Sequence, residues 1–160
     1  MAKLTQTEID ALIAKLKKYP YAAAFGTDEL GPLSGAPQIE GDVEIKDVTL
    51  YETGSDPAAK FLTRNDVKVT VKTRNVDLAM TLLGAFAKGD NILDPTKKKA
   101  LALVPITEAT TEKTITFGSA FLQPGLSMTP GDNDEPSEVT LVFICKADVS
   151  TGKPWTYVGA

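Results

Sequence analysis

The sequence predicts a mainly β protein, an antiparallel β-sandwich or half-open barrel with one flanking α-helix and an additional N-terminal helix. The clearest strand signal is the stretch 67–72, in which three valines alternate with two lysines and a threonine. A second signal is that one helix-like segment, from about Asn75 to Gly89, is inserted among strand-like stretches. The third is that the later strand-like stretches follow one another with short turns between them.

The totals fit one soluble globular domain. The chain has 160 residues, of which 42% are hydrophobic. We divide it into an N-terminal helix (1–20), an extended arm (21–42) and a β-sandwich domain (43–160). No apolar run approaches the roughly 18 residues that span a bilayer, and charges interrupt the N-terminal segment, so we expect no membrane partner and no secretion signal. The net charge of −4 argues against duplex nucleic acid as an ordinary surface partner.

The N-terminal segment Leu4–Lys18 predicts an amphipathic helix. Thr5 and Glu8 have the spacing of a capping box, in which a hydroxyl and a carboxylate satisfy free amides at the helix start. One apolar stripe follows at helical spacing, made of Ile9, Leu12, Ile13 and Leu16. Such a stripe has to be buried, either against the chain's own domain or against a neighbouring subunit.

The stretch 21–42 predicts an extended, irregular arm. Its four glycines and two prolines are spaced so that no long helix can form. A loop of this length without structure of its own is uncommon, so we expect it to be functional or ordered by a partner. The alternative is a surface connection that contains a short strand near Ala22–Phe25.

The stretch 43–51 predicts a strand whose apolar side changes part-way along. Apolar residues occupy odd positions up to Ile45 and even positions from Val48 onward. We therefore expect a bulge or bend near Lys46 and Asp47.

A second strand at 61–74 leads into the inserted helix. Asn75 is a good N-cap residue, and Gly89 has the position of a C-cap. Gly84 costs about 1 kcal/mol relative to alanine inside a helix, so we expect it to mark close packing against a strand. Further strands are expected at 99–106, 113–122, 138–147 and 155–158. In the stretch 139–145, apolar residues occupy both odd and even positions, which predicts a strand covered on both faces.

The residues contain no recognisable catalytic, cofactor-binding or metal-ligating set. The chain has no histidine, which removes the commonest general base and the commonest metal ligand. Its single cysteine, Cys145, can form neither an internal disulfide nor a thiolate zinc site, and we expect a small buried hydrophobe. We therefore expect no enzyme activity, no cofactor and no metal.

Three local patterns leave alternatives open. Asp132 and Asp134 have the alternating spacing of calcium ligands, but no closing glutamate stands at the right distance, and a solvated acidic turn is the alternative. Paired carboxylates could support glycoside hydrolysis, yet no apolar or aromatic setting singles out two of them. Trp155 and Tyr157 fit a stacking surface or a terminal strand that plugs the sheet.

Basic residues mark the strand at 61–74. They are Arg64, Lys68, Lys72 and Arg74. They form either one solvated strand face or a basic stripe that meets phosphate or an acidic partner surface.

The order and texture of these segments resemble the tail tube (major tail) proteins of bacteriophages. One stretch that carries the resemblance is KFLTRNDVKVTVKTRNVDLAMTLLG, a strand followed by a helix rich in small and apolar residues. The other is AFLQPGLSMTPGDNDEPSEVTLVFICKADVSTGKPWTYV, a strand, an acidic turn, a long apolar strand and an aromatic end. The similarity covers roughly Gly41 to Val158, and the N-terminal helix and arm match less well.

The resemblance implies a structural virion protein that forms stacked, hexameric rings. In that family the inner sheets of neighbouring subunits join into a continuous β-barrel, and the stacked rings form a channel for DNA. The implied partners are other copies of this chain, other tail proteins, and DNA that passes through the lumen without specific binding. The implied location is the virion tail, after assembly in the bacterial host cytoplasm, and the family has no catalytic residues to transfer.

Loops and terminal arms make the ring-to-ring contacts in that family. The corresponding segments here, by position, are the first helix, the arm and the loop ETGSDPAAKF. The residues that we expect at subunit interfaces are Leu12, Leu16, Phe25, Leu33, Tyr51, Phe61, Lys68 and Lys72.

Two alternatives to the tube remain. One is another virion component of similar fold, such as a tail terminator, a tail-completion protein or a head decoration protein. The other is a monomeric binding module that resembles immunoglobulin or lipocalin domains.

Overall fold

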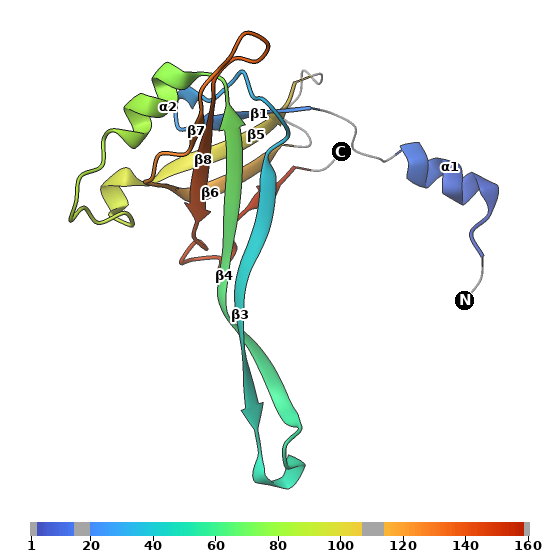
Figure 1. Cartoon of the computed structure of the whole chain (residues 1–160). Helices are drawn as coiled ribbons and strands as arrows, with labels where there is room; N and C mark the ends of the chain where they lie inside the picture. Colours follow the sequence, from blue (N-terminus) through green and yellow to red (C-terminus); the bar gives the residue numbers. More distant parts are fainter. Residues whose placement is uncertain (1–2, 15–19, 107–113, 159–160) are drawn as a thin grey trace.

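The structure is a computed structural model that describes residues 3–14, 20–106 and 114–158. Its helical elements are α1 (Gln6–Ala14), α2 (Val76–Leu83) and the short 3-10 helices η1 (Tyr51–Thr53) and η2 (Pro95–Lys97). Its strands are β1 (Tyr21–Phe25), β2 (Asp28–Glu29), β3 (Gln38–Thr49), β4 (Pro57–Thr73), β5 (Lys99–Pro105), β6 (Ile115–Gln123), β7 (Met128–Thr129), β8 (Glu138–Cys145) and β9 (Thr156–Tyr157). The predicted mainly β fold with a flanking helix and an N-terminal helix is confirmed (Figure 1).

The strands form one curved antiparallel sheet. Its order is β2-β1-β5-β6-β8-β4-β3, and β7 and β9 pair beside this path with β8 and β6. The rings of Phe25 on β1 and Phe143 on β8 lie 4.9 Å apart between centroids, although β5 and β6 separate these strands within the sheet. The sheet therefore bends back over its own core, as a half-open barrel does.

The segment that follows β2 brings the two ends of the sheet together. Leu33 forms an isolated antiparallel bridge with Thr73 at the end of β4. The amide of Ser34 donates to the carbonyl of Lys72 at 2.9 Å. Because β4 lies near the opposite end of the strand order, these contacts nearly close the sheet on itself.

The core lies inside this curved sheet and under α2. Its largest fully buried apolar side chains are Phe117, Phe143, Leu30, Leu101, Leu103, Leu141, Val69, Val71 and Val139. Ala79 of α2 is buried, and Val76, Leu78, Leu82 and Leu83 pack against the core cluster. Alternating residues of β4 and β8 point into the core, which explains the period-two apolar pattern of the sequence.

The inserted helix is shorter than predicted. Asn75 caps it, accepting from the Leu78 amide at 3.4 Å, but α2 ends at Leu83 with Gly84 as its C-cap, and the prediction of a helix that reaches Gly89 is wrong. A Cβ on Gly84 would lie 2.9 Å from the Met80 carbonyl oxygen, within the same turn. The expected packing of Gly84 against a strand is also wrong, since the close neighbour is the carbonyl of the preceding turn.

The stretch 21–42 contains more regular structure than the predicted arm. It supplies β1, β2 and the first residues of β3. Ala23, Phe25 and Leu30 are buried in the core. The alternative of a short strand near Ala22–Phe25 is therefore what the structure shows, whereas the division at residues 20 and 42 stays a prediction.

Strand β8 is fully covered on one face only. Val139, Leu141, Phe143 and Cys145 are buried, and the residues between them are partly exposed. The prediction of two fully covered faces is therefore wrong. The apolar residues of the second face are explained by partial burial.

Candidate assembly surface

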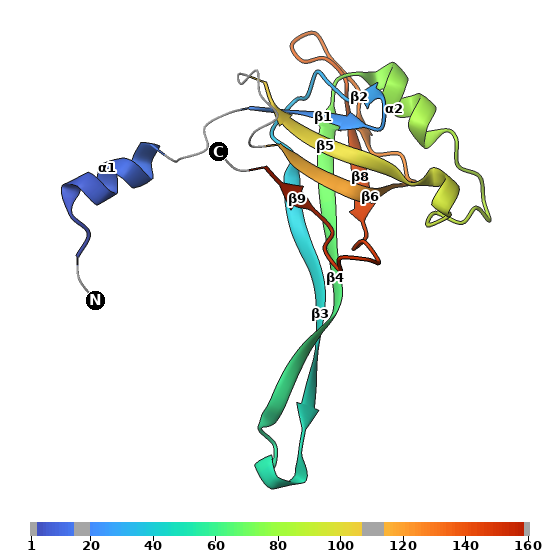
Figure 2. The same ribbon diagram turned by 180° about the vertical axis from the view of Figure 1, so that it is seen from behind.

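A long β-hairpin made of β3 and β4 projects from the body of the subunit (Figures 1 and 2). Every residue of β3 is exposed, and so are seven of the first eight residues of β4. The short helix η1 turns the chain at the tip, where Tyr51 is 99% exposed. A hairpin with this much exposed surface buries little against its own subunit.

The outer edge of β3 has no strand beside it in the described part of the chain. β3 is the last strand in the sheet order and pairs with β4 through all twelve of its residues. A long edge of this kind presents unpaired amides and carbonyls to another strand, and natural proteins usually shorten, bend or cover it. The edge is therefore a ready site for strand pairing with a second chain.

Two irregularities shape the hairpin. Glu44 lies opposite Arg64 and Ile45 opposite Leu62, so Thr63 is an extra residue on β4, and its hydroxyl donates to the Glu44 carbonyl at 3.1 Å. A second register shift lies between Val48 and Thr49. These shifts lie on either side of Lys46 and Asp47, where the change of apolar parity predicts an irregularity.

The register gives the hairpin an apolar face. Residues that pair across an antiparallel ladder lie on the same face, and residues two apart on one strand also share a face. The apolar part of this face consists of Ile39, Val43, Ile45 and Leu62, and toward the tip it ends at the ion pair of Asp47 and Lys60. The apolar side chains are 44% to 58% exposed. Ile39 lies opposite Val69, which is fully buried, so the apolar face continues the core side of the sheet out along the hairpin.

The opposite face of the hairpin is charged in its part nearer the body, whereas Val48 and Phe61 lie on it nearer the tip. Arg64 lies between Asp42 at 2.8 Å and Glu44 at 3.9 Å. One step nearer the body, Glu40 and Lys68 lie opposite each other. Carboxylates therefore accompany the cations along this face, and it remains well hydrated when the apolar face is covered.

The predicted interface residues in the described part of the chain fall into four places: α1, the hairpin, the body part of β4 and the core. Leu12 is exposed on α1, Tyr51 and Phe61 are exposed on the hairpin, and Lys68 and Lys72 are exposed on β4. Phe25 belongs to the subunit's core at 4% exposure, Leu33 is partly buried against it, and Leu16 lies outside the described residues. In the sequence, the apolar residues of this face on β3 are marked only by their alternate spacing, and Leu62 is not marked at all. Only the strand register shows that they lie on one face.

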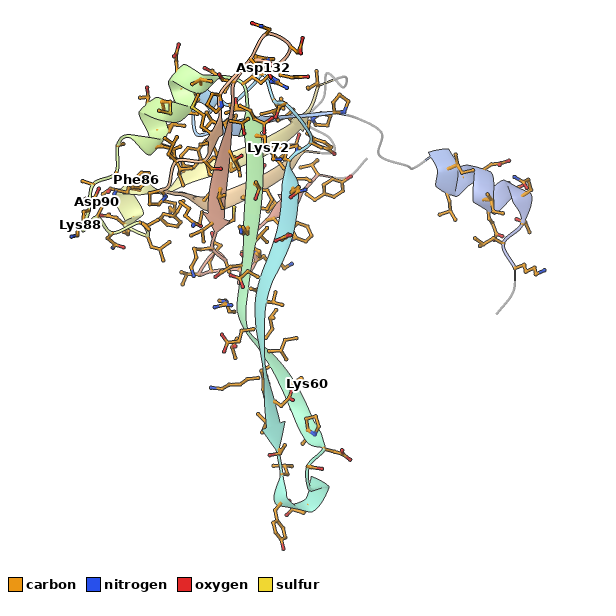
Figure 3. The ribbon with its side chains drawn as sticks, in the orientation of Figure 1. Lys60, Lys72, Phe86, Lys88, Asp90 and Asp132 are labelled. Atoms are coloured by element: carbon orange, nitrogen blue, oxygen red, sulfur yellow. The ribbon has the colours of Figure 1, made fainter. Side chains whose placement is uncertain are left out.

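The basic residues of β4 do not form one unpaired stripe. Arg64 pairs with carboxylates of β3, and Arg74 contacts Glu135 at 3.2 Å and the Pro136 carbonyl at 2.8 Å. Lys72 remains exposed on the body, and Lys60 on the hairpin lies 3.2 Å from Asp47 (Figure 3). Most of this positive charge is therefore matched within the subunit.

The acidic turn is held by its own backbone. Oδ1 of Asp132 accepts the amides of Asp134 and Glu135, both at 2.8 Å, and these hydrogen bonds lower the pKa of its carboxyl group. Asp132 lies at the end of the body away from the hairpin tip (Figure 3). Within the described ranges, no group of three or more metal-ligating residues is gathered.

Two further patterns from the sequence are the single cysteine, Cys145, and the aromatic pair Trp155 and Tyr157. Cys145 is buried, and desolvation, followed by the nearby charge of Asp66, raises the pKa of its thiol to about 12. Trp155 is 50% exposed, and Tyr157 lies in β9, paired with Ile115.

No helix among the described residues is long and apolar enough to cross a membrane.

Comparison with known proteins identifies structures that share this fold. No protein-family model matches the sequence, and no curated protein matches it. A chain in the cryo-EM structure of the anti-feeding prophage tube terminating cap matches with a TM-score of 0.58 and 14% identity, over 100% of this chain and 95% of that one. A chain of the sheath-tube complex of an extracellular contractile injection system, PVC, in the extended state matches with a TM-score of 0.56 and 13% identity, over 89% and 94%. A chain of a tube terminating cap and a chain of a sheath-tube complex thus share the fold of this protein.

Proposed function

We propose that this chain is a structural, non-enzymatic protein of a phage tail or tail-like particle, in which copies assemble into stacked, hexameric rings that form the tail tube. The fold supports this proposal, because chains from a tube terminating cap and from a sheath-tube complex share it along most of their length. The resemblance of the stretches 60–84 and 120–158 to tail tube proteins points to the same role.

The observation that carries the proposal is the twelve-residue edge of β3, unpaired in the described part of the chain, beside an exposed apolar face. Pairing of that edge with the sheet of a second copy satisfies its amides and carbonyls. Packing of the neighbouring copy on the adjoining face covers Ile39, Val43, Ile45 and Leu62. In this proposal the edge meets a different edge of the second copy, so the contact is heterologous, and heterologous contacts close into rings or continue as filaments.

The charged face supports a role as the lining of a tube. On this face the carboxylates of Glu40, Asp42 and Glu44 stand beside the cations of Lys46, Arg64 and Lys68, and the whole chain carries a net charge of −4. A lining of this kind holds phosphate only weakly, so DNA can pass without specific binding. The partners are then other copies of the chain and other tail proteins, and the location is the virion tail after assembly in the host cytoplasm.

A shortened hairpin tests the proposal. In the variant, Asn-Gly replaces residues 45–63, so that a two-residue turn joins the pair Glu44 and Arg64 and leaves the core residues of β4 in place. We expect the wild-type chain to form stacked rings in negative-stain micrographs of concentrated protein. The shortened chain should stay folded and monomeric by circular dichroism and light scattering.

Two outcomes count against a tube. A wild-type chain that is monomeric at every concentration by light scattering favours a binding module. Single rings that never stack favour a tube terminator. The structural likeness to a chain of a tube terminating cap supports this alternative.

A further inference from the structure

An apolar groove lies at one end of the half-open barrel. Its volume is about 620 Å³, and it runs between the start of β1, the segment 31–37, and the adjoining ends of β3, β5 and β6. The apolar side chains that line it include Leu33, Ile39, Leu103, Ile106 and Ile115. Among the described residues none that lines the groove is charged, so its chemistry selects an apolar occupant.

The N-terminal helix α1 has an apolar stripe that no other described part of the subunit covers. Leu4, Ile9, Leu12 and Ile13 are 37% to 56% exposed. The helix stands apart from the body in both views (Figures 1 and 2). A capping box nevertheless stabilises the start of the helix. The Thr5 amide donates to Glu8 Oε2 at 2.7 Å, and the Glu8 amide donates to Thr5 Oγ1 at 3.3 Å.

The apolar stripe of α1 and the groove match in apolar character and in length. Ile9, Leu12 and Ile13 recur at the spacing by which an amphipathic helix presents one face to an apolar groove. A helix of nine residues is roughly 13 Å long, which is the length scale of a groove that crosses three to four strands at about 4.8 Å spacing. In residues 3–14, 20–106 and 114–158 both surfaces are open, and the described part of the subunit does not join them.

We propose that the groove is the docking site for α1 of a second copy of this chain. The inference rests on the proposed self-assembly and specifies one of its contacts. Ile39 belongs both to the groove and to the apolar face of the hairpin, so the docked helix adjoins the β3 edge at which a second copy pairs. Because α1 and the groove are different surfaces, the contact is heterologous and passes from copy to copy, as a ring or a stack requires.

Disulfide trapping between two differently tagged chains tests the docking. One chain carries Leu12→Cys on the apolar stripe, and the other carries Ala36→Cys at the exposed rim of the groove. The native Cys145 is buried and its thiol has a pKa of about 12, so it does not compete in the folded protein. The matched control replaces Leu12→Cys with Thr7→Cys, which lies on the opposite side of the same helix.

We expect the disulfide between Leu12→Cys and Ala36→Cys chains to form at least tenfold faster than the control disulfide. An excess of unlabelled wild-type chain should slow it, and an excess of an Ile9→Asp, Leu12→Asp chain should slow it less, because that chain offers only its groove as a competitor. Equal rates for the two helix positions overturn the docking site. A second outcome also overturns it. In this outcome, a double variant with Leu12→Cys and Ala36→Cys on one chain forms a disulfide within the monomer at a rate independent of concentration, while the mixed chains stay unlinked.

The same samples separate this inference from the proposed function. If micrographs show stacked rings but the specific disulfide does not form, the groove has another role and the tube remains. If the disulfide links chains into small closed oligomers and no rings stack, the docking site is right and the tube is wrong.

Discussion

Asp66 and Lys146 form an ion pair where the hairpin leaves the body. Lys146 Nζ lies 2.8 Å from Asp66 Oδ2, and the Ala147 amide donates to Asp66 Oδ1 at 3.2 Å. The Asp66 side chain is 8% exposed and the Lys146 side chain 39%. The pair therefore ties β4, at its last buried position before the hairpin, to the segment that follows β8.

Removal of the lysine should destabilise the subunit. Lys146→Met leaves the Asp66 carboxylate buried without its cation, and we expect the free energy of unfolding to fall by about 2 kcal/mol. This is less than the about 3–5 kcal/mol of a fully buried pair, because water still reaches Lys146. Urea denaturation measures the change.

The exposed pair of Lys60 and Asp47 provides the control. Their side chains are 63% and 50% exposed at a separation of 3.2 Å. Lys60→Met should change the free energy of unfolding by no more than about 0.5 kcal/mol. Equal effects of the two substitutions would show that burial does not strengthen the Asp66 pair.

The two faces of the hairpin should differ in their effect on assembly. Ile45 on the apolar face and Lys46 beside it on the other face are both exposed. Ile45→Asp should abolish self-association, because it places a charge in the covered contact, and Lys46→Asp should leave self-association largely intact. Both variants should unfold within about 0.5 kcal/mol of the wild type. Sedimentation velocity detects the association, and normal assembly of Ile45→Asp would show that this face stays in water.

Cys145 should make the subunit less stable at alkaline pH. Burial raises the pKa of its thiol from 9.0 to about 12, so between these values the unfolded chain loses a proton that the folded chain keeps. The contribution of the neutral thiol to stability is thus complete below about pH 9 and is lost as the pH rises toward 12, by at most roughly 1.4 kcal/mol per pH unit.

Comparison with Cys145→Ala isolates this effect from the titration of lysines and tyrosines. The variant should be less stable at pH 7, because it leaves a small cavity, but its stability should fall less steeply above pH 9. Parallel slopes for the two proteins would mean that the thiol titrates alike in the folded and unfolded states.

Gly131 should be intolerant of a side chain. A Cβ at this position would lie 2.7 Å from the Ser137 amide nitrogen and 2.9 Å from the Glu135 carbonyl oxygen, which are backbone atoms of the acidic turn. Gly131→Ala should therefore lower the free energy of unfolding by about 1–3 kcal/mol. Gly41→Ala is the control, since a Cβ there meets nothing within 4 Å, and it should change stability by less than about 0.5 kcal/mol in thermal denaturation.

Local patterns predicted the elements better than their ends or their neighbours. The alternation at Val67, Val69 and Val71 identified an inward-facing strand, because side chains on a strand point to alternate faces whatever lies around them. The end of α2 was misplaced, since both Gly84 and Gly89 can cap a helix and the sequence does not rank them. The strand β1 was read as part of an arm, because its alanines carry no strong strand signal and its burial depends on β5.

The candidate assembly surface depended on register more than on composition. The sequence shows that Ile45 and Leu62 are apolar, but their positions place them on the same side only because Thr63 is an extra residue in β4. A shift by one residue would have exchanged the faces of that strand. The expected interface residues Tyr51 and Phe61 lie on the hairpin, whereas Phe25 lies inside the subunit, a difference that no spacing in the sequence reveals.

By itself the sequence determined the fold class, the amphipathic N-terminal helix and the absence of histidine chemistry, because each follows from residue types and from short-range periodicity. The tertiary structure alone decided that β3 is an edge without a neighbouring strand among the described residues, that the hairpin has an apolar stretch on one face, and that a groove whose described lining is uncharged opens beside Ile39. These three features come from contacts between residues far apart in the chain, whose pairing is set by the packing of the whole sheet and leaves no local period in the sequence.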